Sequence, residues 1–522
     1  MSAPALAQRF EDVATPPAPN PGAQPRRRRL PSHAPLAAIL ALQAAVSLSL
    51  HNTAFTDEAL YLYAGHLEIA RLLHHAPTYQ NFASYFSGSP LIYPPIAAAL
   101  AAVGGLEAAR DFSLVLMLAA TGFAYGVGRR VVGERAGMLG ALAFAVLGPT
   151  FFLGHFATYD AMAICLLSVS AWCATRSAGT AVLGWRTLAW AAGAGAAAAV
   201  AGMTKYAALL YVPSVGCLLV LAPIREAGPL AAKARRRRAL VRVAAAVAGF
   251  AVAGEALVAV LGTSFLTGLS STTTNRPDGT NSVAQVAATT WHFLAPVLVL
   301  AAAGAVLERR RGKRFLVAAL ALTALLAPVY QAHLHTIVSL EKHVDYGALF
   351  AAPVAGLALA RLLEWSRSHL SAVVANLALI VAIAVVGVST ARSAFADWTD
   401  SRPLVSLVES QLRPVTGRYL VEDATIPEYY LESIGKPYQW SSTYYFGYVD
   451  PRTHRYLTGL PAYADAFAHR YFNLVVLSFG STYALDLRLS ALLDRSPNYQ
   501  LIAKIPYGGA GRNLFAWRLR TS

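Results

Sequence analysis

Charge is scarce in this sequence. Of the 522 residues, only 13% are charged and 56% are hydrophobic, whereas soluble domains carry about 25% charged residues. This excludes an ordinary soluble domain. Cysteine is scarce too, since Cys165, Cys173 and Cys217 are the only ones, and they fall inside hydrophobic runs without a CxxC or Cys/His pattern. The composition therefore predicts a membrane protein whose cysteines pack between helices.

The first 33 residues lack the apolar stretch that a cleavable signal peptide needs, and they are rich in Pro and Arg. We expect residues 1–33 to form a disordered cytoplasmic arm. In residues 34–391, hydrophobic runs approach the ~20 residues that cross a bilayer as a helix. We predict a transmembrane domain there with about eleven spans, at residues 35–50, 112–128, 136–153, 161–175, 187–203, 206–222, 239–262, 291–307, 315–331, 346–363 and 371–391.

The positive charge is distributed to one side of this predicted topology. The net charge is +16, and most Lys and Arg residues fall between hydrophobic runs in segments that are cytoplasmic if the chain starts inside. The opposite loops hold few cations, which are Arg71, Arg110, Lys205, Arg276 and Lys342. Such an asymmetry follows the positive-inside rule, so it supports the topology and disfavours nucleic acid as a partner.

One hydrophobic stretch, residues 91–103, does not fit as a span. Counting it would move Arg129 and Arg130 to the outside, and it is short, with a Tyr-Pro-Pro sequence at Tyr93. We interpret it as a helix that lies in the outer interface or re-enters the membrane, within a first outer loop at residues 51–111.

Residues 392–522 have a different character, polar and aromatic. Strand-like pieces at 418–421, 474–477 and 501–505 predict a small extracytoplasmic α/β domain. Its aromatic residues, clustered between 429 and 448, could stack on sugars or simply pack together. The predicted fold is thus a polytopic α-helical membrane protein with a small C-terminal α/β domain.

Two adjacent carboxylates, Asp57 and Glu58, follow the first predicted span at the outer membrane surface. An ionised group at this depth is costly unless it is paired, hydrated or functional, and a carboxylate here could take a proton from an acceptor hydroxyl. The alternative is structural, because Thr56 or Asp57 could cap the helix that follows.

Asp160 and Lys205 belong to other outer segments on the same predicted side. Asp160 could orient an acceptor, hold a divalent cation or cap the next helix. Lys205 could neutralise a phosphate leaving group or simply extend its ammonium group to the interface. A further polar group precedes the tenth span and includes His333, His335 and Lys342 to Tyr346; His333 and His335 could form a metal pair.

These features occur in a recognisable order. They are Thr56-Asp57-Glu58-Ala59-Leu60-Tyr61, Tyr93-Pro94-Pro95, Arg129-Arg130, Tyr159-Asp160-Ala161 and Thr204-Lys205. The arrangement resembles the protein O-mannosyltransferase and aminoarabinose-transferase-like branch of the GT-C superfamily, of the glycosyltransferase family 39 or 83 type. The resemblance covers roughly residues 35–365. The sequence departs from the branch at Tyr93, where relatives often have Lys or His.

The resemblance implies a GT-C fold and an enzyme, a hexosyl- or pentosyltransferase. It implies a polyprenyl-phosphate sugar donor, an inverting displacement and catalysis at the outer surface. Asp57 would be the general base, and Glu58 and Asp160 would position the substrates. Lys205 with Lys342 or His343 would stabilise the lipid phosphate, and Tyr61, His155 and Tyr93 would contact the acceptor or sugar. A divalent cation, Mg²⁺ or Mn²⁺, stays open, since some members need one and this sequence has no DxD triplet.

Other classes of function remain as alternatives. A multi-span transporter or flippase of a lipid-linked substrate would also have many helices, but it should carry ionisable residues near the middle of several of them. A non-catalytic scaffold would not need four charged residues on one side. High Ala, Gly and Arg usage indicates a bacterial host, so we expect a plasma-membrane protein whose acceptor is an envelope glycolipid, polysaccharide or protein.

Overall fold

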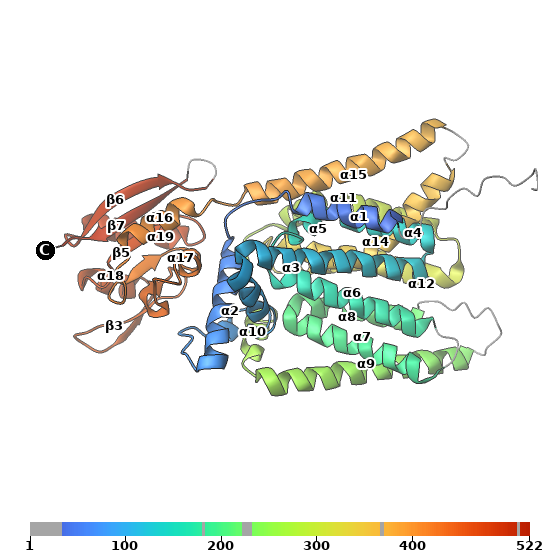
Figure 1. Ribbon diagram of the computed structural model, residues 1–522, viewed down its shortest axis with the longest axis horizontal. Helices are drawn as coiled ribbons and strands as arrows, with labels where there is room; N and C mark the ends of the chain where they lie inside the picture. Colours follow the sequence, from blue (N-terminus) through green and yellow to red (C-terminus); the bar gives the residue numbers. More distant parts are fainter. Residues whose placement is uncertain (1–33, 180–182, 222–231, 366–369, 509–511, 522) are drawn as a thin grey trace, which may run out of the picture.

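The computed structural model describes residues 34–179, 183–221, 232–365, 370–508 and 512–521. It has a long bundle of helices with a smaller mixed domain beyond one end of it (Figure 1). Within the described residues, eight helical stretches are long and apolar enough to cross a membrane. They lie in α3 (Tyr93–Val131), α6 (Tyr159–Ala178), α7 (Trp185–Thr204), α9 (Ala232–Leu261), α11 (Val283–Leu307), α12 to α13 (Arg311–Leu322 and Leu326–His333, joined by η3 at Thr323–Leu325), α14 (Leu340–Trp365) and α15 (Leu370–Ala396).

Three further predicted spans correspond to shorter or broken helices. They are α1 (Ala34–Ser47), the pair α4 (Glu134–Ala145) and α5 (Gly148–Leu153), and η2 (Tyr206–Tyr211) with α8 (Val212–Leu221). Each of the eleven predicted ranges therefore overlaps a helical segment. The multi-pass membrane protein is confirmed, and the count of eleven spans stays a prediction because these three segments are too short by themselves.

Helix α14 lies at the centre of the bundle. In its most apolar stretch 83% of the residues are buried, compared with 6% in α9. An apolar helix that stays exposed in the protein can bury that surface only in lipid, so α9 is a peripheral helix and α14 a core helix.

The stretch predicted as a separate short helix forms the first part of α3. The backbone leaves helical geometry at Gly104 (φ −130°, ψ 19°) and Gly105 (φ 69°, ψ −167°). The positive φ at Gly105 is a conformation that glycine adopts without strain, so the Gly-Gly pair sets the kink. Residues 93–103 are thus distinct from the span that follows, and their depth in the membrane stays a prediction.

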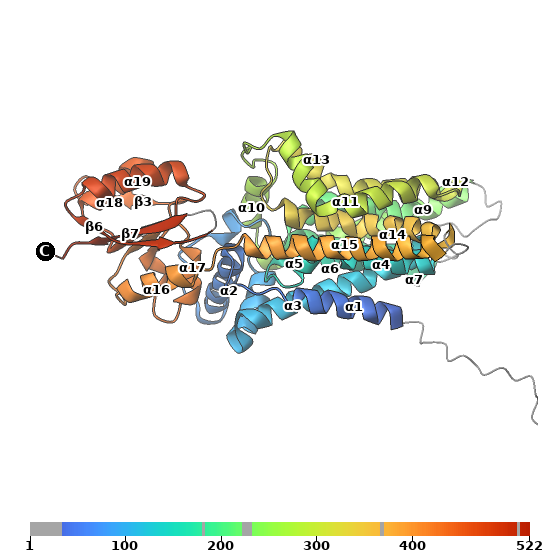
Figure 2. The same cartoon turned by 90° about the horizontal axis from the view of Figure 1, so that it is seen from above.

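Helix α2 (Thr56–His74) occupies the boundary between the bundle and the C-terminal domain, where the two views agree in placing it (Figures 1 and 2). It crosses the direction of the long helices. On one side it packs against α3, and on the other it meets α17 (Thr425–Tyr430) of the C-terminal domain. Its first turn therefore lies where both parts of the molecule meet.

The C-terminal domain contains the predicted α/β structure. Its main sheet has the strand order β2-β1-β5-β7-β6, in which β1 pairs in parallel with β2 and β5, and β7 pairs antiparallel with β5 and β6. The strands are β1 (Tyr419–Val421), β2 (Trp440–Ser441), β5 (Leu474–Leu477), β6 (Tyr499–Pro506) and β7 (Asn513–Leu519), with a separate hairpin of β3 (Gly447–Val449) and β4 (Tyr456–Thr458). The remaining helices are α16 (Arg402–Gln411), α18 (Gly459–Ala468) and α19 (Tyr483–Arg495). Helix α15 continues to Ala396, past the predicted boundary at residue 391.

Candidate functional site

A cavity of about 640 Å³ opens at the end of the bundle next to α2. Its wall combines residues of six segments: the start of α2, Ser87 in the loop before α3, the end of α7 with η2, helix α10 (Phe265–Thr272) with the loop after it, the end of α13, and the start of α14 with the loop before it. Its charged lining residues are Asp57, Lys205, Arg276 and Lys342, and its other ionisable lining residues are His333, His343, Tyr61, Tyr206, Tyr211 and Tyr330. Leucines from η2 and α10 give the same cavity an apolar side.

Asp57 and Lys342 form an ion pair at this cavity, with 2.5 Å between Asp57 Oδ2 and Lys342 Nζ. The lysine side chain is only 4% exposed and the aspartate is 30% exposed, so the carboxylate is the partner that a ligand can reach. Asp57 lies in the first turn of α2, whose N-cap residue is Phe55, and the side chain that caps this helix end is Glu58, which accepts a hydrogen bond from Phe55 N at 3.1 Å. The helix-cap alternative for Thr56 and Asp57 is therefore not what the structure contains.

Asp160 and Lys205 form a second pair, with 3.5 Å between Asp160 Oδ1 and Lys205 Nζ. Asp160 also accepts hydrogen bonds from the Tyr346 hydroxyl at 3.1 Å and from Thr158 Oγ1 at 3.3 Å. Lys205 lies 4.6 Å from the centre of the Tyr159 ring and is 4% exposed, so its ammonium group points into the protein rather than outward to the interface.

Backbone pairing holds Lys205 in place. Ser89 N donates to Met203 O at 2.8 Å, and Tyr206 N donates to Ser87 O at 2.9 Å. Between these bonds, a Cβ on Gly88 would come within 1.9 Å of the carbonyl oxygen of Thr204, so only glycine fits. The segment after η1 (Phe82–Ser84) and the end of α7 are therefore fixed side by side.

A chain of hydroxyl groups links α2 to this wall. The Tyr61 hydroxyl donates to the Tyr159 hydroxyl at 2.6 Å, and Ser87 Oγ lies 2.6 Å from the same oxygen. Burial and the nearby charge of Asp57 raise the pKa of Tyr61, so its hydroxyl stays protonated and can donate. Tyr61 lines the cavity, in the position to contact a bound ligand that the sequence predicts for it.

Glu58 points away from the cavity. It is fully buried and forms a two-point ion pair with Arg110, at 2.9 Å to Nε and 2.7 Å to Nη2. It also accepts from the backbone N–H groups of Ala157 at 2.7 Å and Phe55 at 3.1 Å. With both oxygens engaged in this way, Glu58 joins α2 to α3 and to the loop before α6, and it does not contact the cavity where substrates would be positioned.

His155 and Tyr93, predicted as contacts for acceptor or sugar, also lie outside this cavity. Tyr93 is buried at the start of α3, with its hydroxyl 3.4 Å from Ser113 Oγ. His155 is buried between α5 and α6, where burial lowers its pKa, and its Nε2 is 3.0 Å from Glu107 Oε2. The side chains therefore separate into a cavity group and a second group around Arg110.

His343 completes the cavity group among the predicted residues. Its Nδ1 lies 2.9 Å from Gln331 Nε2, so that nitrogen accepts the amide hydrogen and the ring orientation is fixed. Arg276 and His333 line the same cavity, from the loop after α10 and from the end of α13. Their position on the predicted outer side is the sequence signal for them, but only the folding of that loop over the bundle end brings them to this wall.

A divalent cation does not fit between Asp57 and Asp160 in this arrangement. Each carboxylate already faces an ammonium group, and in the part of the chain that the structure describes neither belongs to a group of three metal-ligating side chains. The same holds for His333 and His335, since the ring of His335 faces the backbone oxygen of Asn281 at 3.1 Å. The lysines supply the positive charge at this site.

A second cavity, of about 790 Å³, lies between α2 and α17. Tyr63 and His66 line it from α2, and Tyr429 and Glu432 from the C-terminal domain. His66 Nδ1 is 2.7 Å from Glu432 Oε2, and this contact raises the pKa of the histidine. Part of the predicted aromatic cluster thus faces a cavity, while other members pack in the domain core.

No family model matches the sequence, and no curated protein matches it either. Solved structures do match. The archaeal oligosaccharyltransferase AglB from Archaeoglobus fulgidus, in complex with an inhibitory peptide and a dolichol-phosphate, has a TM-score of 0.56 at 12% identity, over 91% of this chain and 74% of that one. ArnT from Cupriavidus metallidurans bound to undecaprenyl phosphate has a TM-score of 0.55 at 16% identity, over 92% and 97%.

The chain therefore has the GT-C fold, as predicted. The similarity to ArnT spans nearly the whole of both chains and includes the C-terminal domain in its 92%. At such low identity the likeness establishes the fold, and the function has to be argued from the cavity.

Proposed function

We propose that this protein is a membrane glycosyltransferase that moves a sugar from a polyprenyl-phosphate donor to a cell-envelope acceptor. The observation that carries the proposal is the pair of lysine–carboxylate contacts, Asp57–Lys342 and Asp160–Lys205, of which Asp57 and both lysines line one cavity. Two solved structures with this fold hold polyprenyl phosphates, dolichol-phosphate in AglB and undecaprenyl phosphate in ArnT.

The donor phosphate would bind among the cations of the cavity. Lys205, Lys342 and Arg276 bring three positive charges to a wall that is otherwise partly apolar. A phosphate group favours such a cluster because charge-assisted hydrogen bonds in a partly dry site are stronger than bonds in water. The leucine side of the cavity suits the first isoprene units of the carrier lipid.

Asp57 would act as the general base. When Lys342 turns its ammonium group to the donor phosphate, the exposed carboxylate of Asp57 is released from its ion pair and can accept the proton of the acceptor hydroxyl. The acceptor oxygen attacks the anomeric carbon, the bond from that carbon to the phosphate oxygen breaks, and the electron pair leaves with the polyprenyl phosphate. The configuration inverts because attack and departure take place on opposite faces.

Asp160 and Glu58 would act without touching the reacting atoms. Asp160 orients Lys205 through their ion pair, while Glu58 fixes the first turn of α2 through Arg110. We assign Tyr61 to the contact with the sugar or acceptor, and His343 to the phosphate end of the cavity.

The site would act at the outer face of a bacterial plasma membrane. The cavity and the C-terminal domain lie at the bundle end that the distribution of Lys and Arg predicts to be outside. The cavity's charged residues gather at that end rather than along a path through the helices, which favours surface chemistry over transport by a transporter or flippase.

The decisive experiment measures transfer of radiolabelled sugar from a panel of polyprenyl-phosphate donors into envelope acceptors. It compares membranes that contain wild-type protein with membranes that contain Asp57→Asn at matched expression. Asp111→Asn serves as the control, because Asp111 is an exposed carboxylate on α3 outside the cavity. We expect transfer with the wild type and the control, and a fall of about 10²–10⁴-fold in Asp57→Asn, the usual contribution of a general base.

Equal transfer by all three proteins would remove Asp57 from the role of base. Binding of undecaprenyl phosphate to purified protein provides a second measurement that needs no acceptor. If the wild type fails to bind any polyprenyl phosphate, and transport of a lipid-linked sugar is observed instead, the enzyme proposal is wrong.

A further inference from the structure

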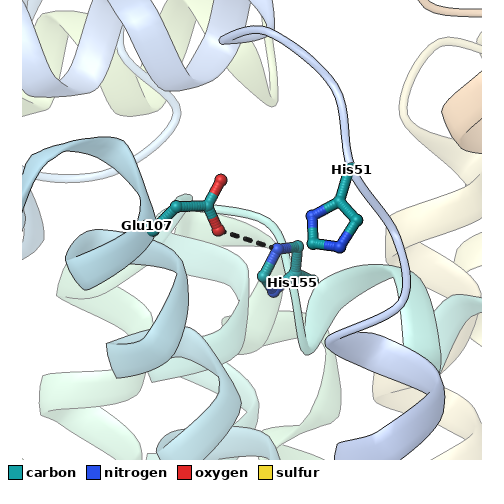
Figure 3. A group of neighbouring side chains, drawn as sticks. All are labelled: His51, Glu107 and His155. Carbon is teal, nitrogen blue, oxygen red and sulfur yellow. Dashed lines mark ion pairs between the residues drawn. The ribbon is translucent and has the colours of Figure 1, made fainter.

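Three side chains from distant parts of the chain meet near one another (Figure 3). His51 comes from the loop after α1, Glu107 from the part of α3 that follows the glycine kink, and His155 from the loop between α5 and α6. One ligand atom of each, two imidazole nitrogens and a carboxylate oxygen, lies within 4.8 Å of the other two. None of the three lines either cavity described above.

His155 is the least satisfied member of this group. It is 1% exposed, yet neither of its ring nitrogens has a hydrogen-bond partner. Its Nε2 lies 3.0 Å from Glu107 Oε2 without the geometry of a hydrogen bond, and its ring meets that of His51 edge-on at 5.9 Å between centres. A buried polar group without a partner is rare in proteins, so its presence points to a ligand that supplies the missing contact.

The charges around His155 favour a cation. Glu107 accepts a hydrogen bond from Arg110 at 3.1 Å through its other oxygen, and Arg110 is already paired with Glu58. Two carboxylates and one guanidinium leave one negative charge without a partner. A neutral imidazole ring has a lone pair that can bind a metal, and the unpartnered ring nitrogens of His155 are buried beside Glu107.

We propose that His51, Glu107 and His155 bind a divalent transition-metal ion of the zinc type. Two imidazoles and one carboxylate are a common protein ligand set for Zn²⁺, with a fourth position left to water. Ions such as Mg²⁺ and Ca²⁺ prefer oxygen ligands throughout, and they bind such a set poorly. His51 and Glu107 are exposed, so the ion reaches the site from solvent.

The bound ion acts as a structural clamp. Through Glu107 it joins the Arg110–Glu58 pair, and Glu58 in turn holds the backbone of Ala157. Glu58 is next to Asp57 in the chain, and Ala157 is three residues before Asp160. The ion therefore fixes the first turn of α2, which carries Asp57, and the loop that leads into Asp160, and its binding does not depend on what reaction these carboxylates serve.

The start of the C-terminal domain is attached at the same point. Asn52, the neighbour of His51, donates hydrogen bonds to the backbone oxygens of Phe395 at 3.0 Å and Trp398 at 3.1 Å. A metal ligand at His51 holds this loop from the other side. Loss of the ion should consequently loosen the connection between the bundle and the domain.

The test measures zinc directly on purified full-length protein in detergent. The protein is stripped with a chelator, exchanged into metal-free buffer and titrated with Zn²⁺ against a fluorescent competitor, and the metal content is measured by mass spectrometry. We expect one zinc ion per chain. His51→Ala and Glu107→Gln should bind at least about 100-fold more weakly, because loss of an outer partner of a metal ligand already costs about 10–100-fold.

Two controls separate this site from other binding. His335→Ala removes an exposed histidine of the same predicted side that is not in the cluster, and Asp57→Asn tests whether the cavity holds the ion instead; both should bind zinc as the wild type does. Zinc should raise the melting temperature of the wild type and of both controls but not of His51→Ala. His51 and Glu107 are exposed, so their substitution leaves a foldable protein even if His155 variants do not fold.

The proposal is overturned if the wild type binds less than one zinc ion per chain at micromolar free zinc. It is also overturned if His51→Ala and Glu107→Gln bind as tightly as His335→Ala. Loss of zinc in Asp57→Asn but not in His51→Ala would place the ion in the cavity. None of these readouts uses sugar transfer, so their result is independent of the proposed glycosyltransferase activity.

Discussion

Asp57 and Glu58 are neighbours in the chain, yet they belong to two different regions of the molecule. Successive residues of a helix point about 100° apart, so the first turn of α2 sends one carboxylate into the cavity and the other into the core around Arg110. Asp57 has one partner, Lys342, and is partly exposed, whereas Glu58 has four hydrogen-bond donors and is buried. Two adjacent carboxylates therefore have different roles: Asp57 faces the cavity, and Glu58 holds helices together.

The largest effect on stability should come from the Glu58 side. Glu58→Gln removes the two-point ion pair from the buried Arg110, which keeps only its contact with the exposed Glu107; breaking a buried ion pair costs about 3–5 kcal/mol. A thiol-reactive dye can measure unfolding, because Cys165 and Cys173 are buried and react only when the bundle opens. We expect a much lower melting temperature for Glu58→Gln than for wild type.

Asp57→Asn is the matched control for that measurement, since it removes the same charge one residue earlier. Its melting temperature should fall less than that of Glu58→Gln, because Asp57 is partly exposed and has a single ion-pair contact, with Lys342. The double variant Glu58→Met with Arg110→Met should be more stable than either single variant, because neither member of the buried pair is left without the other. Equal destabilisation by Asp57→Asn and Glu58→Gln would contradict the division of α2 into two sides.

A smaller effect is expected at the cations of the cavity. Lys205→Met should raise the KM for the polyprenyl-phosphate donor by about 10–100-fold, since one charged hydrogen bond contributes about 1.5–3 kcal/mol. Lys504→Met, on strand β6 of the C-terminal domain, removes an ammonium group outside the cavity and should leave KM unchanged. If both variants give the wild-type KM, the donor phosphate binds elsewhere.

The last prediction concerns how stability depends on pH. It involves Glu428, a residue of the C-terminal domain on α17, which packs against α2. Burial raises the pKa of Glu428 to about 8, and Gln80 Nε2 is 3.4 Å from its carboxyl oxygen. A carboxyl group whose pKa is raised by folding stays protonated in the folded state after the unfolded chain has lost the proton. Stability contributed by this group therefore falls as pH rises from about 4.5 to 8.

Glu428→Gln should remove this pH dependence because the amide does not titrate. We expect the variant to melt at a higher temperature than wild type at pH 8 and at the same temperature near pH 4.5. Thermal unfolding of the two proteins at several pH values in the same detergent measures the difference. If the two melting temperatures differ by the same amount at every pH, the substitution changes packing and not the ionisation of residue 428.

The fold could be predicted from the sequence where the physics is local. Apolar runs and the distribution of Lys and Arg predicted the helical segments, and the strands β1, β5 and β6 lie in or next to the predicted ranges. Residues 91–103 were predicted to form a helix separate from the next span, because counting them as a span would have placed Arg129 and Arg130 on the wrong side; the structure joins them to that span through the kink in α3. Such signals depend on nearest neighbours or on the membrane itself.

The contacts between side chains could not be predicted in the same way. The sequence placed Asp57, Asp160, Lys205 and Lys342 on one side, but it did not say which acid meets which lysine. That choice depends on how α2, α6, α7 and α14 pack. The resemblance implied that Glu58 positions a substrate beside Asp57. In the structure, α3 packs against α2 and brings Arg110 within 2.7 Å of Glu58, so Glu58 lies outside the cavity.

The backbone pairing at Gly88 has a consequence for motion. Because the segment 87–89 is hydrogen-bonded to the end of α7, Ser87 and Lys205 must move together. Lys342 lies on another helix, α14, and its side chain can turn without moving that segment. When a bulky lipid phosphate enters, the cavity wall therefore adjusts first through the Lys342 side chain, while Ser87 and Lys205 stay in place.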